Sequence, residues 1–154
     1  NYIMNHVIST IVTVPCPDNG KVSIELIRTN TKVEGKIESG EPKIDIKVWT
    51  EGNVGDAQCN IDLSKPKNIY ALEDNVGKKI KSEMEATIIK AQEDLKSDIF
   101  GFGETIHRAD PKTWKDLKSD WDTKFEKLEV NIEVNAKIRR LGTIKKSFQK
   151  EIGE

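Results

Sequence analysis

A glycine pair ahead of a polar stretch is the pattern in this sequence that most resembles a chemical site. Gly101 and Gly103 flank Phe102, and His107 follows shortly after them. A Gly-x-Gly turn before a helix can hold a phosphate, but the dinucleotide fingerprint requires a third glycine, and position 106 is isoleucine. A helix leads into the pair, where that fingerprint requires a strand. The pattern therefore predicts a helix end with a tight turn, and no cofactor.

His107 is the residue of this stretch best suited to acid–base chemistry. Together with Glu104 or Asp110 it could form a general acid–base pair, and a hydrolase that uses His107 is the weakest of the functions we consider. No serine or cysteine nucleophile stands in a recognisable turn nearby. We therefore expect no catalytic residue and no enzyme activity, with His107 at a surface or capping position.

The sequence contains two cysteines, Cys16 and Cys59, which lie far apart in the chain. They could form a disulfide, or they could be two small, half-buried strand residues. Zinc requires about four close ligands, and the distant His6 and His107 do not complete such a set. The sequence therefore predicts no metal site and leaves the disulfide open.

Aromatic residues gather between Asp98 and Phe125. Trp114, Leu117 and Trp121 fall at helical spacing, and aromatic residues in such a pattern more often form core than contact surface. We therefore expect Trp114 and Trp121 to be buried. Aromatic groups can also be hot spots for a partner, so we expect Phe102 to be exposed and to act, with Phe100, as an interaction residue.

A basic run closes the chain. Between residues 137 and 150 there are six basic residues and no acidic one, namely Lys137, Arg139, Arg140, Lys145, Lys146 and Lys150. Such a run could contact an anionic membrane surface or an acidic loop of a partner, or it could be a solvated tail. No motif for nucleic acid accompanies it. The candidate interaction residues are therefore Phe100, Phe102, Arg139, Arg140, Lys145 and Lys146.

The elements that carry these residues follow from hydrophobic periodicity. Alternating apolar residues predict strands over residues 12–14, 22–37, 44–48 and 130–138. Apolar residues at steps of three and four predict a long helix over residues 68–96, in which Gly77 suggests a close backbone contact. Asp110 and Pro111 mark the start of a short helix that bears the two tryptophans. We expect an α+β fold in which an antiparallel sheet of about four strands carries the long helix across one face.

Length and composition fit one domain. The chain has 154 residues, 36% hydrophobic and 33% charged, with a net charge of −1, so overall charge favours no class of partner. No apolar run approaches the ~20 residues that span a bilayer, and residues 1–15 do not read as a signal peptide. We expect a single domain over residues 1–154, with a core over about 6–142 and a basic tail over 143–154.

The central block also resembles a known family. The segment from Asp98 to Arg108, followed by Pro111, Trp114, Trp121 and Phe125, is similar to the C-terminal domain of the C subunit of bacterial spore germination receptors, the GerAC-like lipoproteins. The helical segment Ile88–Gln92 before the block and the strand Val130–Gly142 after it also resemble that family. The resemblance covers about residues 8–142.

This resemblance implies a function that composition does not show. The family's full-length members are lipoproteins, anchored through an N-terminal cysteine to the outer face of the spore inner membrane, where they work with membrane-embedded A and B subunits in sensing nutrients. Neither Cys16 nor Cys59 lies in a lipobox, and the chain begins with Asn1, so we expect a soluble C-terminal piece of such a protein. Its expected role is non-catalytic support of receptor assembly or signal relay. The alternative is a domain that holds a small nutrient near Gly101 and Phe102.

Overall fold

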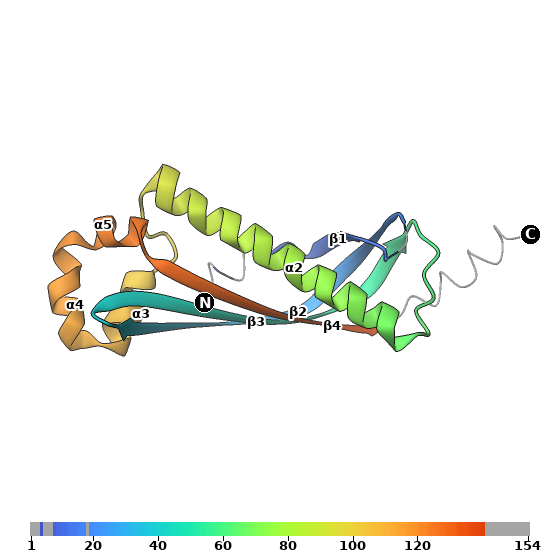
Figure 1. Ribbon diagram of the computed structural model, residues 1–154, viewed down its shortest axis with the longest axis horizontal. Coiled ribbons are helices and arrows are strands. Elements are labelled where there is room, and N and C mark those ends of the chain that lie inside the picture. The colour runs from blue at the N-terminus through green and yellow to red at the C-terminus, as the bar shows by residue number, and fades with distance from the viewer. Residues whose placement is uncertain (1–3, 5–7, 18, 141–154) are drawn as a thin grey trace, which may run out of the picture. The chain divides into compact units, whose positions relative to one another are not determined.

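The computed structural model describes Met4, residues 8–17 and residues 19–140, with the side chain of Arg140 left out (Figure 1). Its elements, in chain order, are strands β1 (Ile11–Pro15), β2 (Lys21–Glu38) and β3 (Glu41–Ala57), helices α2 (Pro66–Lys90), α3 (Phe102–Ala109), α4 (Pro111–Leu117) and α5 (Trp121–Glu126), and strand β4 (Glu129–Arg140). A π-helical turn over Ala91–Leu95 extends α2, and a 3₁₀ turn over Lys118–Asp120 separates α4 from α5. The Trp-bearing segment is therefore two short helices, where the sequence predicted one.

The four strands form one sheet in the order β1-β2-β3-β4. Strand β1 pairs antiparallel with β2, with Val12 opposite Ile24 and Val14 opposite Val22. Strands β2 and β3 are joined by the two residues Ser39 and Gly40, whose φ angles of 51° and 79° are both positive, as a two-residue hairpin turn requires.

Strand β4 runs parallel to β3. The side-chain contacts between them advance together along both strands, from Lys43 with Glu129 to Glu51 with Arg139. The α+β class, the four strands and the long helix are thus confirmed, but the sheet is mixed and not antiparallel throughout. Strand β4 can lie parallel to β3 because the chain between them passes through α2 and the short helices. Parallel strands require a long crossover connection of this kind.

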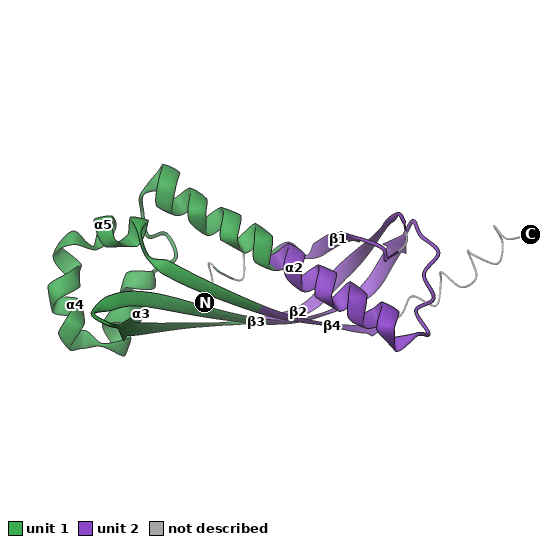
Figure 2. Ribbon diagram, in the orientation of Figure 1, with its two compact units in different colours: residues 1–8, 31–48, 81–133 green, residues 9–30, 49–80, 134–154 purple. Residues whose placement is uncertain are grey.

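The contacts divide the chain into two compact units (Figure 2). Unit 1 contains Asn1–Ile8, Thr31–Val48 and Lys81–Glu133, and unit 2 contains Ser9–Asn30, Trp49–Ile80 and Val134–Glu154. Strands β2, β3 and β4 and helix α2 contribute residues to both.

Unit 1 has a core of aliphatic and aromatic residues. Apolar residues at helical spacing in α2 and alternating residues in β3 are all buried, namely Met84, Ile88, Ile44, Ile46 and Val48. Helix α3 lies directly against β2 at Gly35, where an added Cβ would come within 3.0 Å of Ile106 and 3.1 Å of the Thr105 carbonyl oxygen. The absence of a side chain at Gly35 therefore lets this helix approach the strand closely.

Unit 2 has its own core, built from the start of α2 and the ends of the strands. Its buried members are Val12, Val14, Val22, Ile24, Val54, Leu72, Val76 and Ile80. Helix α2 is fastened to β4 by Glu73, whose carboxylate accepts the backbone N–H of Ile138 at 2.9 Å. A Cβ at Gly77 would lie 3.4 Å from the carbonyl oxygen of Val134. The expected contact with a backbone is present, but it leaves room for a methyl group.

Candidate functional site

The start of α3 is organised around one carboxylate, that of Asp98. It accepts three hydrogen bonds, from the backbone N–H of Phe102 at 3.0 Å, from that of Gly103 at 2.7 Å and from Nε1 of Trp121 at 3.0 Å. The free N–H groups at a helix start attract anions. Because Asp98 already supplies the anion, a phosphate would have to displace it, and the structure explains this helix start without a cofactor.

Each position of the Gly-x-Gly pair requires glycine for a different structural reason. Gly101 has a φ of 75°, which side chains rarely adopt, and it stands immediately before α3. At Gly103 an added Cβ would lie 2.7 Å from Nε1 of Trp121 and 2.9 Å from a ring carbon of Trp114. The pair therefore opens a helix and makes room for two indoles, whereas the sequence predicted a helix end.

The aromatic residues form a packed cluster under this helix start. Phe102 contacts Phe100 and Phe125, with ring centroids 5.2 and 6.4 Å apart, and Trp114 meets Trp121 edge to face at 5.2 Å. Phe102 is fully buried and Phe100 is 4% exposed. The expectation of an exposed Phe102 was wrong, because the helix that starts at this residue turns its ring inward, and neither phenylalanine offers a contact surface. Trp121 is buried as expected, while Trp114 is only half-buried.

A second polar side chain ties the π-helical turn after α2 to the end of α5 and to the residue before β4. Nε2 of Gln92 donates to the carbonyl oxygen of Phe125 at 3.1 Å and to that of Leu128 at 2.9 Å. Phe125 belongs to the last turn of α5, and Leu128 lies between α5 and β4. Gln92 and Asp98 together hold the short helices between α2 and β4.

Sequence reasoning missed the roles of both Asp98 and Gln92. The available signal for Asp98 was an acidic residue shortly before a glycine and a new helical segment, which is typical of helix caps. Gln92 had no comparable signal, since its partners are backbone groups more than thirty positions away.

His107 lies at the surface, as expected from the sequence. Its Nδ1 is 3.4 Å from Oε2 of Glu104, with 48% and 62% of the two side chains exposed, and its ring stacks on Trp114 at 5.8 Å. Asp110 does not join this pair. It accepts hydrogen bonds from the backbone N–H and the hydroxyl of Thr113 at 2.9 and 2.8 Å, which hold the pKa of its carboxyl below the usual value. Asp110 therefore caps α4.

The basic candidates are only partly described. Lys145, Lys146 and the side chain of Arg140 lie outside the described residues. Arg139 is described: its Nε donates to Oε2 of Glu51 at 2.8 Å, and its guanidinium lies 5.9 Å from the centre of the Trp49 ring. The sequence did not reveal that Glu51 and Trp49 contact Arg139, because both lie on a different strand, β3.

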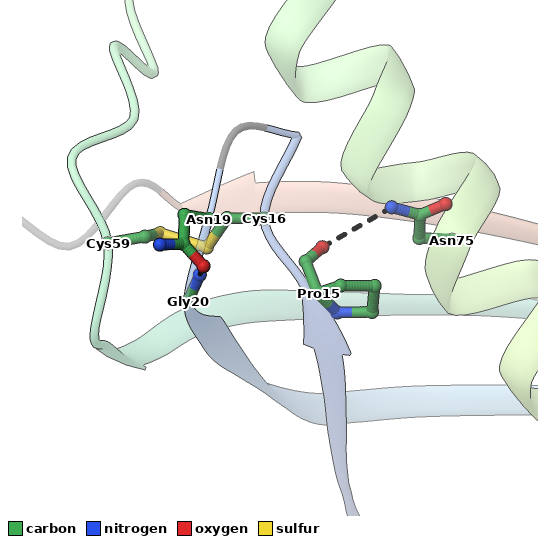
Figure 3. The surroundings of a disulfide bond; sticks show 6 residues. All are labelled: Pro15, Cys16, Asn19, Gly20, Cys59 and Asn75. Atoms are coloured by element: carbon green, nitrogen blue, oxygen red, sulfur yellow. Dashed lines mark hydrogen bonds between the residues drawn. A yellow bond between two sulfur atoms is a disulfide. The ribbon is translucent and has the colours of Figure 1, made fainter.

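Cys16 and Cys59 are joined by a disulfide (Figure 3). The bond links the turn after β1 to the segment after β3, and Asn75 of α2 donates to the carbonyl oxygen of Pro15 beside it at 3.3 Å. Gly20 completes the turn: its φ is 86°, and an added Cβ would lie 2.0 Å from the Gln58 carbonyl oxygen. Disulfides persist in oxidising surroundings and are rare in reducing ones.

Two further kinds of feature, a metal site and a membrane-spanning helix, have no support among the described residues. Over those residues no group of three or more His, Cys, Asp or Glu side chains is placed to hold a metal ion. None of the described helices combines the length and the apolar character that crossing a bilayer demands.

Comparison with known families defines the class of protein to which this chain belongs. Residues 1–142 match the family described as "Spore germination B3/GerAC like, C-terminal", and the chain belongs to this family. The resemblance drawn from the central block is thereby confirmed.

Particular relatives come from Bacillus subtilis (strain 168). Spore germination protein KC is 32% identical over 92% of this chain, and spore germination protein B3 is 27% identical over 86% of it. The chain spans only 35% and 36% of the length of these two relatives. A solved structure, the crystal structure of the GerBC protein, matches with a TM-score of 0.76 at 23% identity, over 89% of this chain and 42% of that one. This structural match establishes the fold.

Proposed function

We propose that this chain is the C-terminal domain of a germinant receptor C subunit, and that it supports receptor assembly or signal relay without catalysis. The observation that carries the proposal is the family match over residues 1–142. The full-length protein would be a lipoprotein on the outer face of the spore inner membrane, with membrane-embedded A and B subunits as partners.

Two features of the structure support this proposal. The disulfide between Cys16 and Cys59 suits an extracytoplasmic location. The charged groups at the start of α3 are used for folding: Asp98 is occupied by its three donors, and the pair of His107 and Glu104 is exposed, with no nucleophile recognised in the surrounding sequence. The first point supports the proposed location, and the second favours a scaffold over an enzyme.

The alternative, a domain that holds a small nutrient near Gly101 and Phe102, has less support. Phe102 is fully buried by its aromatic neighbours, so its ring does not offer a binding surface. Calorimetry of the chain against amino acids, sugars and nucleosides separates the two functions. A scaffold domain gives no heat of binding at millimolar concentrations, whereas a saturable signal with one nutrient would establish the alternative.

The experiment that tests the proposed function uses the full-length protein in spores. We expect nutrient-triggered germination to fail when this domain is deleted, and to be weakened when Asp98 is replaced by alanine. The Asp116→Ala variant is the matched control, because Asp116 is an exposed acid of α4. Normal nutrient germination of spores that carry the deletion would contradict the proposal.

A further inference from the structure

Two arginines from different strands converge on one carboxylate in unit 2. Glu51 of β3 is enclosed, with 12% of its side chain exposed. Nε of Arg139 on β4 lies 2.8 Å from its Oε2, and Nε of Arg28 on β2 lies 3.6 Å from its Oε1. The arginines themselves remain open to solvent, since 52% of Arg139 and 72% of Arg28 are exposed.

This arrangement leaves hydrogen-bond donors and positive charge unused. Each guanidinium approaches Glu51 through Nε, and among the described residues the terminal nitrogens of the two groups make no hydrogen bond. Two guanidinium charges against one carboxylate leave a net charge of +1. An arginine fork matches a carboxylate in shape and offers it two parallel bonds, so a second carboxylate can be bound from the solvent side.

An aromatic ring adjoins these donors. Trp49 is half-buried on β3, and the guanidinium of Arg139 lies 5.9 Å from its ring centre. Tryptophan and arginine are the residue types most enriched in the energetic centres of protein interfaces. All members of the cluster stand on strands, which hold them in a fixed geometry before a partner arrives.

The charged strand residues of unit 1 show a different pattern. There three lysines are matched by acids: Lys32 pairs with Glu34 at 2.8 Å, Lys36 with Asp45 at 2.9 Å, and Lys43 with Glu38 and Glu129 at 2.8 and 3.2 Å. The hydrogen bond from Lys36 lowers the pKa of Asp45, as in a stable ion pair. The excess of cationic donors thus distinguishes the Arg28–Glu51–Arg139 group from these three lysine pairs.

We propose that Arg28, Arg139 and Trp49 form a docking surface for an acidic segment of a protein partner. Carboxylates of the segment accept hydrogen bonds from the terminal nitrogens of both arginines, and its apolar atoms contact Trp49. The proposal rests on the proposed function, because that function supplies a protein partner. An anionic membrane fits less well, because recognition of anionic lipid depends on clusters of about 4–8 basic residues, whereas this group has one excess charge.

The test is binding of a fluorescein-labelled decaglutamate peptide to the whole chain, followed by fluorescence polarisation at low salt. Removing one exposed ion pair costs less than about 1 kcal/mol, so we expect about threefold weaker binding for Arg28→Gln and about tenfold for the double variant with Arg139→Gln. Arg28→Gln leaves the closer pair of Glu51 and Arg139 in place, so folding is retained. The control is the double variant Lys47→Gln with Arg108→Gln, which removes the same charge from other exposed positions and should change binding less than about twofold.

Two outcomes would overturn the docking surface. One is an equal loss of binding in the arginine and control variants, which would indicate unspecific attraction. The other is sedimentation with phosphatidylglycerol vesicles that depends on Arg28 while the peptide does not bind.

Co-purification experiments in spores distinguish failure of the docking surface from failure of the proposed function on which it rests. If deleting the domain from the full-length protein abolishes co-purification with the membrane subunits but the double arginine variant co-purifies normally, the docking surface is wrong and the proposed function stands. If the deletion itself is harmless, the proposed function fails, and the peptide assay alone decides whether the surface binds acidic segments.

Discussion

Replacing Asp98 with alanine should loosen the connection between α2 and β4. The change leaves the N–H groups of Phe102 and Gly103 without their side-chain acceptor and leaves Nε1 of Trp121 unpaired. Loss of a helix cap costs about 1 kcal/mol, and an unpaired, partly buried donor costs about 1–3 kcal/mol. We therefore expect the free energy of unfolding to fall by about 2–4 kcal/mol.

Two further variants make this prediction specific. Asp98→Asn keeps the shape and one acceptor oxygen, but its NH2 nitrogen only donates and cannot accept a hydrogen bond, so we expect a loss between that of the alanine variant and zero. Asp116→Ala removes an exposed acid from the neighbouring helix α4 and should change stability by less than about 0.5 kcal/mol.

The assay is urea unfolding followed by far-ultraviolet circular dichroism, combined with hydrogen exchange at the amides of Phe102 and Gly103. We expect these two amides to lose protection in Asp98→Ala, and amides of the β1–β2 pairing in unit 2 to keep it. If Asp98→Ala unfolds within about 0.5 kcal/mol of the unchanged chain, the role assigned to Asp98 is refuted.

The remaining predictions concern the disulfide, the long helix and one helix cap. Replacing Cys16 and Cys59 with serine should lower stability by about 4 kcal/mol in chain-entropy terms, given their sequence separation of 43, and thermal unfolding with and without reductant measures this. Gly77→Ala should raise stability by about 0.5–1 kcal/mol, since alanine favours the helix and its methyl group fits; a loss of stability in urea would show that the contact with Val134 is tighter than described. The carboxyl of Asp110 should titrate below the ordinary aspartate value of 3.8 in an NMR titration. Because the folded-state pKa is lowered, its contribution to stability is complete above the unfolded value and is lost as the pH falls through the folded one; a normal pKa would contradict the cap.

The long helix and the last strand were predictable because their apolar residues follow one period over many positions. The stripe from Leu72 to Ala91 is buried in the structure, and the alternation in β4 places Ile132 and Ala136 inside. The helix start at Asp110 and Pro111 was predictable for a local reason, because a cap and its helix are neighbours in sequence.

Features that depend on distant partners were not predictable in the same way. Alternation shows that Val130–Ile138 is a strand, but it carries no information on direction, so the parallel pairing of β4 with β3 was missed. Periodicity also did not reveal that Phe102 begins a helix and turns inward. The disulfide joins two residues whose proximity is set by the strand pairing.

The candidate site was predicted in part. The sequence pointed to Arg139 through the basic run, but the residues that orient it, Glu51 and Trp49, come from another strand. The block from Asp98 to Phe125 led to the correct family, and in the fold it is a joint held by Asp98 and Gln92.

Co-purification of the full-length protein with the proposed A and B subunits from spore membranes, with and without this domain, shows directly whether the domain supports receptor assembly. We expect the A and B subunits to be recovered with the intact protein and lost when the domain is deleted, while the shortened protein remains anchored and present in normal amount. Full recovery of both subunits with the shortened protein would contradict the claim that this domain supports receptor assembly.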